Sequence, residues 1–446
     1  MRFSQWLLFG TLLLGSLSQA QADSEQPIEQ FSLANGMKVI VLPNHRVPAV
    51  NHMLWFRIGA ADDPDGKSGL AHFHEHVMFK GSPKFGQGEY TRLVDLNGGN
   101  HNAFTGHDAT SYYVTIAKEK LPLVMELEAD RMKALTVFDE EALKENEVIR
   151  EERRQMTDNS PDAQLQEQMN AALFRNHPYH NPVIGWMHEM KGLTKQDVLD
   201  FHSKFYHPNN AILIVSGDIT AAELKPLAEK YYGGLPKKSV PPRIWKQEPP
   251  QISARSVTLH HPHVKQPSFS RDYIATSIAQ SDMKHALSVY VMAYLLGGGK
   301  NSELYQSLVV EQKLAASVDT NYNLFSRGDG ELSIDITPEN NVTLATIEQA
   351  LDKSLAEFLK KDTDGEKLAR AKKAMKAETI YGREGLTSIS NIMGWIVTAD
   401  LPPETYNQWN DLIDSITADD IKGAAKNSLK IEQSVTGYLL PQEALP

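Results

Sequence analysis

The sequence predicts an α+β protein with two similar domains, each a mainly antiparallel sheet packed with helices. Its 446 residues are too many for one ordinary domain and a comfortable length for two. Residues 236–250 contain five Pro together with several Lys and Arg, a composition typical of an extended linker. The chain after this stretch repeats the plan of the chain before it in weaker form.

The first half begins with strands. Residues 30–58 alternate apolar and polar residues and carry turn signals at Asn35-Gly36 and Pro43-Asn44, which predicts paired strands. Thr194-Lys-Gln-Asp197 is typical of a capping box that opens a helix running toward residue 205. The other expected elements are helices over 88–96 and 121–135, strands over 101–117, an acidic helix from about residue 139 and a buried strand over 211–217.

The second half carries a short echo of the first. Thr417-Ala-Asp-Asp420 mirrors the Thr194 capping box, and each box precedes a helix and then a strand containing Gly217 or Gly437. A helix is expected from Met283 to Leu296, ending at a run of three Gly, at the position that the His-rich segment of the first half occupies. Its corresponding face is apolar, so no metal ligands are expected there.

The segment His72-Phe73-His74-Glu75-His76 carries the strongest chemical signal. Read as H-x-x-E-H on a helix, it places His72 and His76 on one face, with Glu75 beside them. This order reverses the commoner H-E-x-x-H pattern and is itself a zinc-peptidase signature. His74 points away from this face, so we expect it to pack rather than to bind metal.

A catalytic zinc site needs a third protein ligand and an open position. The acidic helix expected over residues 141–154 supplies candidates, because Glu145 and Glu152 lie seven residues apart and share a face. From the residues alone, any carboxylate of this helix could be the ligand. The helix could equally be a solvated surface element with ion pairs along it.

Several further segments together resemble the pitrilysin/insulinase family of zinc peptidases, and most of all its shorter branch, which includes the mitochondrial processing peptidases. The resemblance covers nearly all of the chain after residue 28. Besides H-x-x-E-H, the matching segments are 98–105 (GGNHNAFT), 108–113 (DATSYY), 145–152 (ENEVIREE), 177–179 (HPY) and 205–210 (FYHPNN).

The resemblance implies a role for each residue of the metal site. His72 and His76 would bind one Zn²⁺ per chain, and Glu75 would be the general base. Alignment through Val148-Ile149 selects Glu152 as the third ligand, although a shift by one residue would select Glu151. Glu145 would support the site from behind the ligands.

The resemblance also implies a substrate strand and an activity. The peptide substrate would lie as an added strand along Asn102, Ala103, Phe104 and Thr105, held by main-chain hydrogen bonds. The expected activity is therefore zinc-dependent endopeptidase cleavage of extended peptides or unfolded segments. With the internal repeat, the resemblance implies two homologous domains: a zinc-binding peptidase domain at 23–235, a linker at 236–254 and a domain without metal at 255–446.

One family feature is missing. Active relatives place an Arg, and seven residues later a Tyr, in a second-half domain of the same chain or of a partner. Here Val309 and Ala316 occupy those positions, and neither side chain donates a hydrogen bond. We therefore expect the chain to be the zinc-bearing subunit of a heterodimer whose homologous partner supplies Arg and Tyr. The alternative is a non-proteolytic, chaperone-like subunit that holds peptides in the same groove.

Composition and the N-terminus indicate the compartment. The chain has no Cys, which excludes disulfides and thiolate ligands, and its net charge of −11 argues against a nucleic-acid partner. Arg2, an apolar run over 6–17 and Ala20-Gln21-Ala22 predict a signal peptide at residues 1–22. An uncleaved anchor is the alternative, but the run is shorter than the ~20 residues of a membrane span. We expect a periplasmic protein without a stable span.

Overall fold

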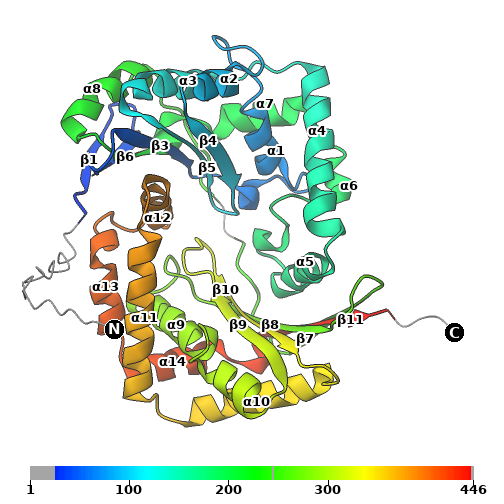
Figure 1. Cartoon of the computed structure of the whole chain (residues 1–446). Coiled ribbons are helices and arrows are strands. Elements are labelled where there is room, and N and C mark those ends of the chain that lie inside the picture. The colour runs from blue at the N-terminus through cyan, green and yellow to red at the C-terminus, as the bar shows by residue number, and fades with distance from the viewer. Residues whose placement is uncertain (1–25, 244–245, 443–446) are drawn as a thin grey trace, which may run out of the picture.

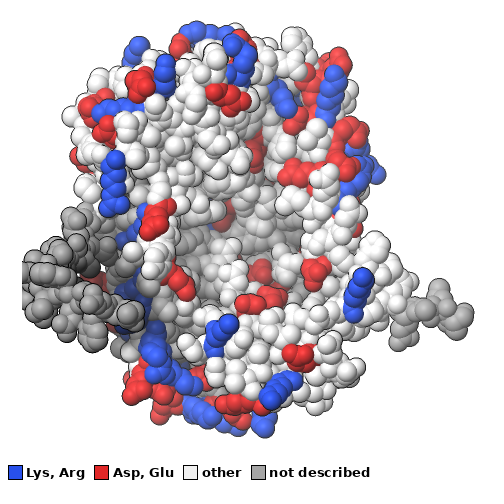
Figure 2. Space-filling view, viewed as in Figure 1, with Lys and Arg blue, Asp and Glu red and all other residues white. Residues whose placement is uncertain are grey.

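The computed structural model describes residues 26–243 and 246–442, so the expected signal peptide at 1–22 lies outside the described residues. The fold consists of two mixed β-sheets with helices, one sheet from each half of the chain (Figure 1). The halves face one another across a hollow that is visible between them in the space-filling view (Figure 2). Among the described residues, no helix has the length and apolar character needed to cross a membrane.

The N-terminal sheet has six strands in the order β1-β2-β6-β3-β5-β4. All neighbouring strands are antiparallel except β2 and β6. The last strand in this order, β4, therefore forms one edge of the sheet. The strands are β1 (Glu29–Ser32), β2 (Lys38–Pro43), β3 (Ala49–Phe56), β4 (Asn100–Thr105), β5 (Thr110–Ala117) and β6 (Ala211–Gly217).

The C-terminal sheet repeats this arrangement with five strands in the order β7-β11-β8-β10-β9. Its parallel pair, β7 with β11, takes the place of β2 with β6, and its edge strand β9 takes the place of β4. The strands are β7 (Arg255–His261), β8 (Ser268–Ala275), β9 (Ala315–Tyr322), β10 (Gly330–Pro338) and β11 (Ser434–Pro441). The predicted fold class, two similar α+β units, is confirmed.

Helices cover one face of each sheet with their apolar sides. The predicted capping boxes are present, because Thr194 and Asp197 open α7 while Thr417 and Asp420 open α14. The helices of the first half are α1 (Leu70–Val77), α2 (Glu89–Leu96), α3 (Leu121–Lys133), α4 (Asp139–Arg153), α5 (Pro161–Leu173), α6 (Met187–Met190), α7 (Lys195–Phe205) and α8 (Ala221–Tyr232). Those of the second half are α9 (Met283–Gly297), α10 (Leu344–Lys360), α11 (Gly365–Gly382), α12 (Leu386–Thr398), α13 (Thr405–Ser415) and α14 (Ala418–Ser428).

Each half contributes one helix to the other half's sheet. Helix α12 packs on β3 and β6, and helix α5 packs on β7 and β11. Both contacts are made at a Gly, and the contact at Gly394 requires one because the neighbouring ring is rigid. A Cβ on Gly394 of α12 would lie 1.9 Å from the Trp55 ring, and a Cβ on Gly437 of β11 would lie 2.1 Å from the sulfur of Met169. The apolar clusters around these contacts bind the halves into one body.

One buried and two half-buried carboxylates lie beside α5 on the C-terminal sheet. The side-chain amide of Gln166 donates to Asp272 on β8 at 3.0 Å and lies 3.2 Å from Glu331 on β10. Asp335 on β10 lies on the same face, because its register partner is Ser270 and that of Asp272 is Ser333. Burial and the nearby Asp335 raise the pKa of Glu331 to about 7.

Glu331→Gln is expected to raise the melting temperature at pH 8 and to raise it much less at pH 5. The pKa of Glu331 is higher in the folded state, so its stabilising contribution is present below the unfolded value near 4.5 and is lost as pH rises through about 7. Gln mimics the protonated acid at every pH. Thermal unfolding at the two pH values, with the exposed Glu339→Gln as control, tests this. Equal shifts at both pH values would contradict it.

Candidate metal centre

The helix that carries the motif is held at its N-terminus by a neighbouring turn. Gly69 precedes α1 with φ of +86°, and a Cβ there would lie 2.5 Å from the carbonyl oxygen of Ile184. The Asp63 carboxylate accepts hydrogen bonds from the backbone amides of Gly69 and Ala71, both at 2.8 Å. It thus satisfies amides that a helix start leaves without partners. Asp63 is not among the residues predicted from the sequence, where its only signal is a short polar side chain a few positions before the helix.

Three predicted residues converge on one point. The Nε2 atoms of His72 and His76 lie 3.7 and 3.3 Å from Oε2 of Glu152, which reaches them from the end of α4. One ligand atom from each residue lies within 4.8 Å of the other two. Ligand atoms bound at about 2.0–2.1 Å to a tetrahedral zinc are about 3.4 Å apart, so this donor set fits zinc in type and spacing.

Carboxylates surround the imidazole of His76. Its Nδ1 lies 2.9 Å from Oε1 of Glu145, whose other oxygen pairs with Lys80 at 2.5 Å. Burial lowers the pKa of His76, but the hydrogen bonds to Glu145 and Glu152 outweigh burial and raise it to about 9. A contact of this kind orients an imidazole so that its other nitrogen faces a metal.

The charges differ between the two imidazoles. Burial and the neighbouring His76 lower the pKa of His72 to about 4, so this ring is neutral at physiological pH. The hydrogen bond to His76 lowers the pKa of Glu152, which therefore stays ionised. His76, by contrast, carries a proton at physiological pH between its two carboxylate partners, and it must release that proton before both imidazoles can bind a metal.

Glu151 points elsewhere. Its side chain is 53% exposed and pairs with Arg154 at 2.7 Å on the outer surface of the helix. Glu152, at 34% exposed, faces the two imidazoles. The difference follows from helix geometry, because adjacent residues point about 100° apart. The arrangement favours the register that selects Glu152.

The side chain of Glu75 extends from the motif helix toward the edge strand β4. Its side chain is buried, and Oε2 accepts a hydrogen bond of 2.6 Å from the hydroxyl of Thr105. Burial raises the pKa of Glu75, while the Thr105 hydrogen bond opposes this shift. A carboxylate whose pKa is moved toward neutrality is better suited to accept and return a proton.

Strand β4 contains all four residues predicted to contact substrate. As an edge strand it has main-chain groups directed away from its partner β5, where an extended peptide could pair. Successive side chains face opposite sides of the sheet. Thr105 faces the motif helix, while the ring of Phe104 lies 5.2 Å from that of Trp55 and 5.9 Å from that of Trp395 on α12.

The remaining sequence expectations concern residues away from the metal donors. His74 is buried, with Nε2 3.1 Å from Nδ1 of His202, in keeping with a packing role. Val309 packs partly buried against the C-terminal core, and Ala316 is exposed on the edge strand β9. The structure thus offers no side-chain donor at either position.

The fold and this site together have the layout of the reversed-motif class of zinc peptidases. A family model described as "Insulinase (Peptidase family M16)" matches residues 38–186, and one described as "Peptidase M16 inactive domain" matches 192–375. A Helicobacter pylori protein named "Zinc protease PqqE" is 30% identical over 93% of this chain and 93% of its own length. The chain belongs to the M16 peptidase family, which confirms the resemblance drawn from the sequence.

Solved structures share the fold. The crystal structure of a protease from Helicobacter pylori has a TM-score of 0.87 at 26% identity, covering 94% of this chain and 100% of that one. The periplasmic protease PqqL from Escherichia coli has a TM-score of 0.79 at 20% identity, covering 94% of this chain and 48% of that one. At 20% identity, the similarity to PqqL shows that the fold is shared and nothing more.

Glu152→Gln is expected to weaken zinc affinity far more than Glu151→Gln, its matched control on the adjacent position. An amide lacks the charge of a carboxylate ligand, and Glu151 faces away from the two imidazoles. Titration with zinc against a competing chelator measures both affinities. A zinc-poor Glu151→Gln variant would show that the neighbouring carboxylate is the ligand.

Proposed function

We propose that this chain is a zinc-dependent endopeptidase that cleaves extended peptides or unfolded segments. The observation that carries the proposal is that His72, His76 and Glu152 converge beside the buried Glu75. Glu75 in turn accepts a hydrogen bond from Thr105 on the edge strand β4. In this proposal His72, His76 and Glu152 hold one Zn²⁺, and Glu145 orients His76. Residues 102–105 pair with the backbone of the substrate.

The residues of the chain divide the chemistry between them. Zinc, when bound, supplies a Lewis acid that polarises the peptide carbonyl and makes a water molecule more acidic. Glu75 accepts the proton of the attacking water as the new C–O bond forms, and it returns that proton to the amine nitrogen as the C–N bond then breaks. Strand β4 fixes the peptide in an extended form, which places one carbonyl beside Glu75.

Glu75→Gln is expected to lower peptide hydrolysis by at least ~10²-fold while zinc stays bound, because Glu75 moves protons and is not a ligand. Turnover of a quenched peptide and metal analysis of the same preparation test both halves of this statement. The Glu151→Gln variant, altered at an exposed position of α4, serves as the control with full activity. Zinc loss or substantial turnover in Glu75→Gln would contradict the assignment.

We further propose that the chain works as the zinc-bearing member of a heterodimer. The support is the absence of a donor at Val309 and Ala316, while the metal donors converge. A homologous partner with Arg and Tyr at these positions would stabilise the oxyanion of the transition state. The lack of donors at these two positions would also fit the alternative, a subunit that only holds peptides. Simple binding, however, requires no general base, and the buried Glu75 beside the imidazoles is placed as one.

The purified chain alone is expected to bind about one zinc and to hydrolyse peptides slowly, because a missing oxyanion donor typically costs ~10²–10³ in rate. Addition of a homologous two-domain protein that has Arg and Tyr but no H-x-x-E-H should restore the rate. The measurement is chelator-sensitive turnover with and without that partner. Fast hydrolysis by a homogeneous monomer would refute the division of labour.

For localisation, we propose export to the periplasm with removal of residues 1–22. The support is the signal-like composition of those residues and the periplasmic description of the PqqL structure that shares the fold. The proposed substrates, unfolded segments and peptides, would then be periplasmic.

A further inference from the structure

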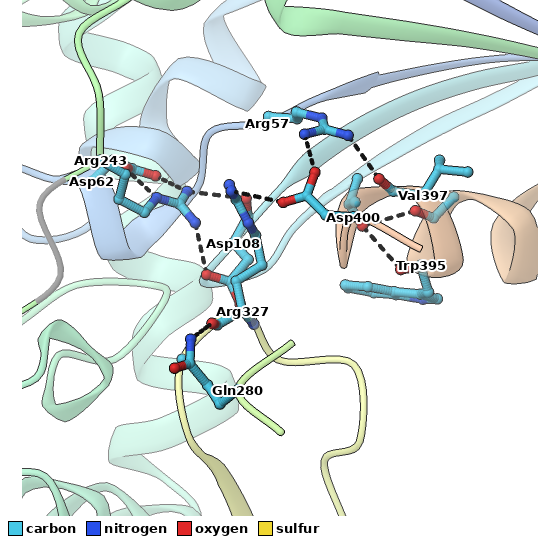
Figure 3. A network of polar contacts seen from close by, with 12 residues as sticks. Arg57, Asp62, Asp108, Arg243, Gln280, Arg327, Trp395, Val397 and Asp400 are labelled. Atoms are coloured by element: carbon cyan, nitrogen blue, oxygen red, sulfur yellow. Dashed lines mark hydrogen bonds and ion pairs between the residues drawn. The ribbon is translucent and has the colours of Figure 1, made fainter. Parts of the chain in front are cut away.

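A buried cluster of charges joins the linker to both halves of the molecule (Figure 3). The guanidinium of Arg243, in the Pro-rich segment, donates to Asp62 at 2.7 Å and to Asp108 at 2.8 Å. It also donates at 3.1 Å to the main-chain oxygen of Asp108. All three side chains are 9% exposed or less. The segment predicted to be an extended linker thus inserts one side chain between two loops of the N-terminal half.

Those two loops carry the parts of the proposed active site. Asp62 belongs to a short turn at residues 60–62, and the next residue, Asp63, holds the start of the metal helix. Asp108 lies in the turn at 106–109 that follows Thr105 at the end of β4. The amides of Ala60 and Ala61 donate to the carbonyls of residues 106 and 107 at 3.0 and 2.9 Å, so the two loops touch directly.

The cluster also reaches the C-terminal half. The second carboxylate oxygen of Asp108 accepts hydrogen bonds from the Tyr179 hydroxyl at 2.5 Å and from the backbone amide of Arg327 at 2.9 Å. The side chain of Arg327 continues to Asp400 at 3.3 Å, and Asp400 pairs with Arg57 at the end of β3 (Figure 3). The position of the turn at 106–109 therefore depends on the position of the C-terminal half relative to the N-terminal half.

A buried ion pair is a weak source of stability, because removing its charges from water costs about as much as their attraction returns. Burial raises the pKa of Asp62 even with Arg243 beside it, which shows that the desolvation cost is large here. What the fork of Arg243 does supply is geometry, since its planar donors hold two carboxylates at fixed relative positions.

Resting on the proposed function, we infer that Arg243 is a positioning residue that sets the distance between the metal helix and the substrate strand. It acts through Asp62 on the turn next to Asp63 and through Asp108 on the turn after Thr105. The position of β4 relative to Glu75 thereby depends on the linker. Through Arg327, it also depends on the position of the C-terminal half.

Four variants of the full-length chain test this inference. Arg243→Gln removes both ion pairs, and Arg243→Lys keeps the charge without the fork. The double variant Asp62→Asn with Arg243→Gln removes the positive charge of Arg243 and the negative charge of Asp62 together. It tests the role of Arg243 if the single Arg243→Gln variant unfolds because Asp62 is left buried and unpaired. Lys246→Gln is the matched control, because Lys246 lies in the same linker and makes an exposed pair with Asp65 at 3.2 Å.

Each variant is loaded with zinc and compared with the wild type below its melting temperature. Amide hydrogen exchange is measured over residues 100–109 and over β8 and β10. Affinity for a short fluorescein-labelled unstructured peptide is measured in the Glu75→Gln background, where turnover is suppressed. Arg243→Gln and the double variant should hold about one zinc, exchange faster only over 100–109, and bind the peptide at least ~10-fold more weakly. Arg243→Lys should be intermediate, and Lys246→Gln should match the wild type.

A lower melting temperature with unchanged local exchange and unchanged peptide affinity would overturn the inference, since Arg243 would then be only a structural tie. Faster exchange throughout both halves would overturn it as well. These readouts do not require catalysis. If the wild type hydrolysed no peptide even with a partner, the proposed function would fail, while local exchange over 100–109 would still decide the role of Arg243.

Discussion

The site depends on the fixing of one short helix. Helix α1 has eight residues, and an isolated helix of that length is not stable in water. Its stability must come from tertiary contacts, and two kinds are present: the apolar face of Leu70, Phe73 and Val77 lies in the core, and Asp63 satisfies the first amides. Because the helix is fixed at its start and along one face, the opposite face directs His72 and His76 toward Glu152.

A second constraint holds the two halves as one body. Helices α5 and α12 each cross to the other half's sheet, and Gly394 allows an approach to the Trp55 ring that a Cβ would prevent. The proposed substrate strand, β4, lies at this junction, since the ring of Phe104 lies 5.9 Å from that of Trp395 on α12. Relative movement of the halves would therefore change the surroundings of β4, along which the substrate is proposed to pair.

Local signals allowed much of this structure to be predicted. The strand over 211–217, the capping boxes at Thr194 and Thr417, and the repeat of the element order are all as expected, because each rests on nearby residues. The convergence of His72 and His76 followed from helical spacing alone. The choice of Glu152 over Glu151 did not, because a solvated acidic helix offers similar carboxylates on several faces, and it came from the family resemblance.

Other features had no local signal. The apolar face of α5 indicates that the helix is buried, but an apolar face does not specify which sheet covers it. Arg243 lies in a Pro-rich segment, and composition predicts exposure there. Its two carboxylate partners are about 180 and 135 residues away in sequence, so only the fold brings them together. Long-range polar contacts of this kind are specified by topology rather than by spacing.

The repeat also explains why, among the residues that the structure describes, side chains suited to bind a metal converge in the first half alone. Strand β9 occupies the edge of the second sheet as β4 does in the first, so both sheets offer main-chain groups to an extended partner. The helix that follows the second strand of the C-terminal sheet, α9, has Val289, Val291 and Met292 fully buried, so no ligand faces that edge. At η6 (Tyr305–Glu311) Val309 packs against the core. A rotamer change cannot supply the missing donors, because the side chains of Val309 and Ala316 contain none. The second half therefore repeats the architecture of the first without its metal-ligand side chains, and under the proposed division of labour a partner supplies the oxyanion donors.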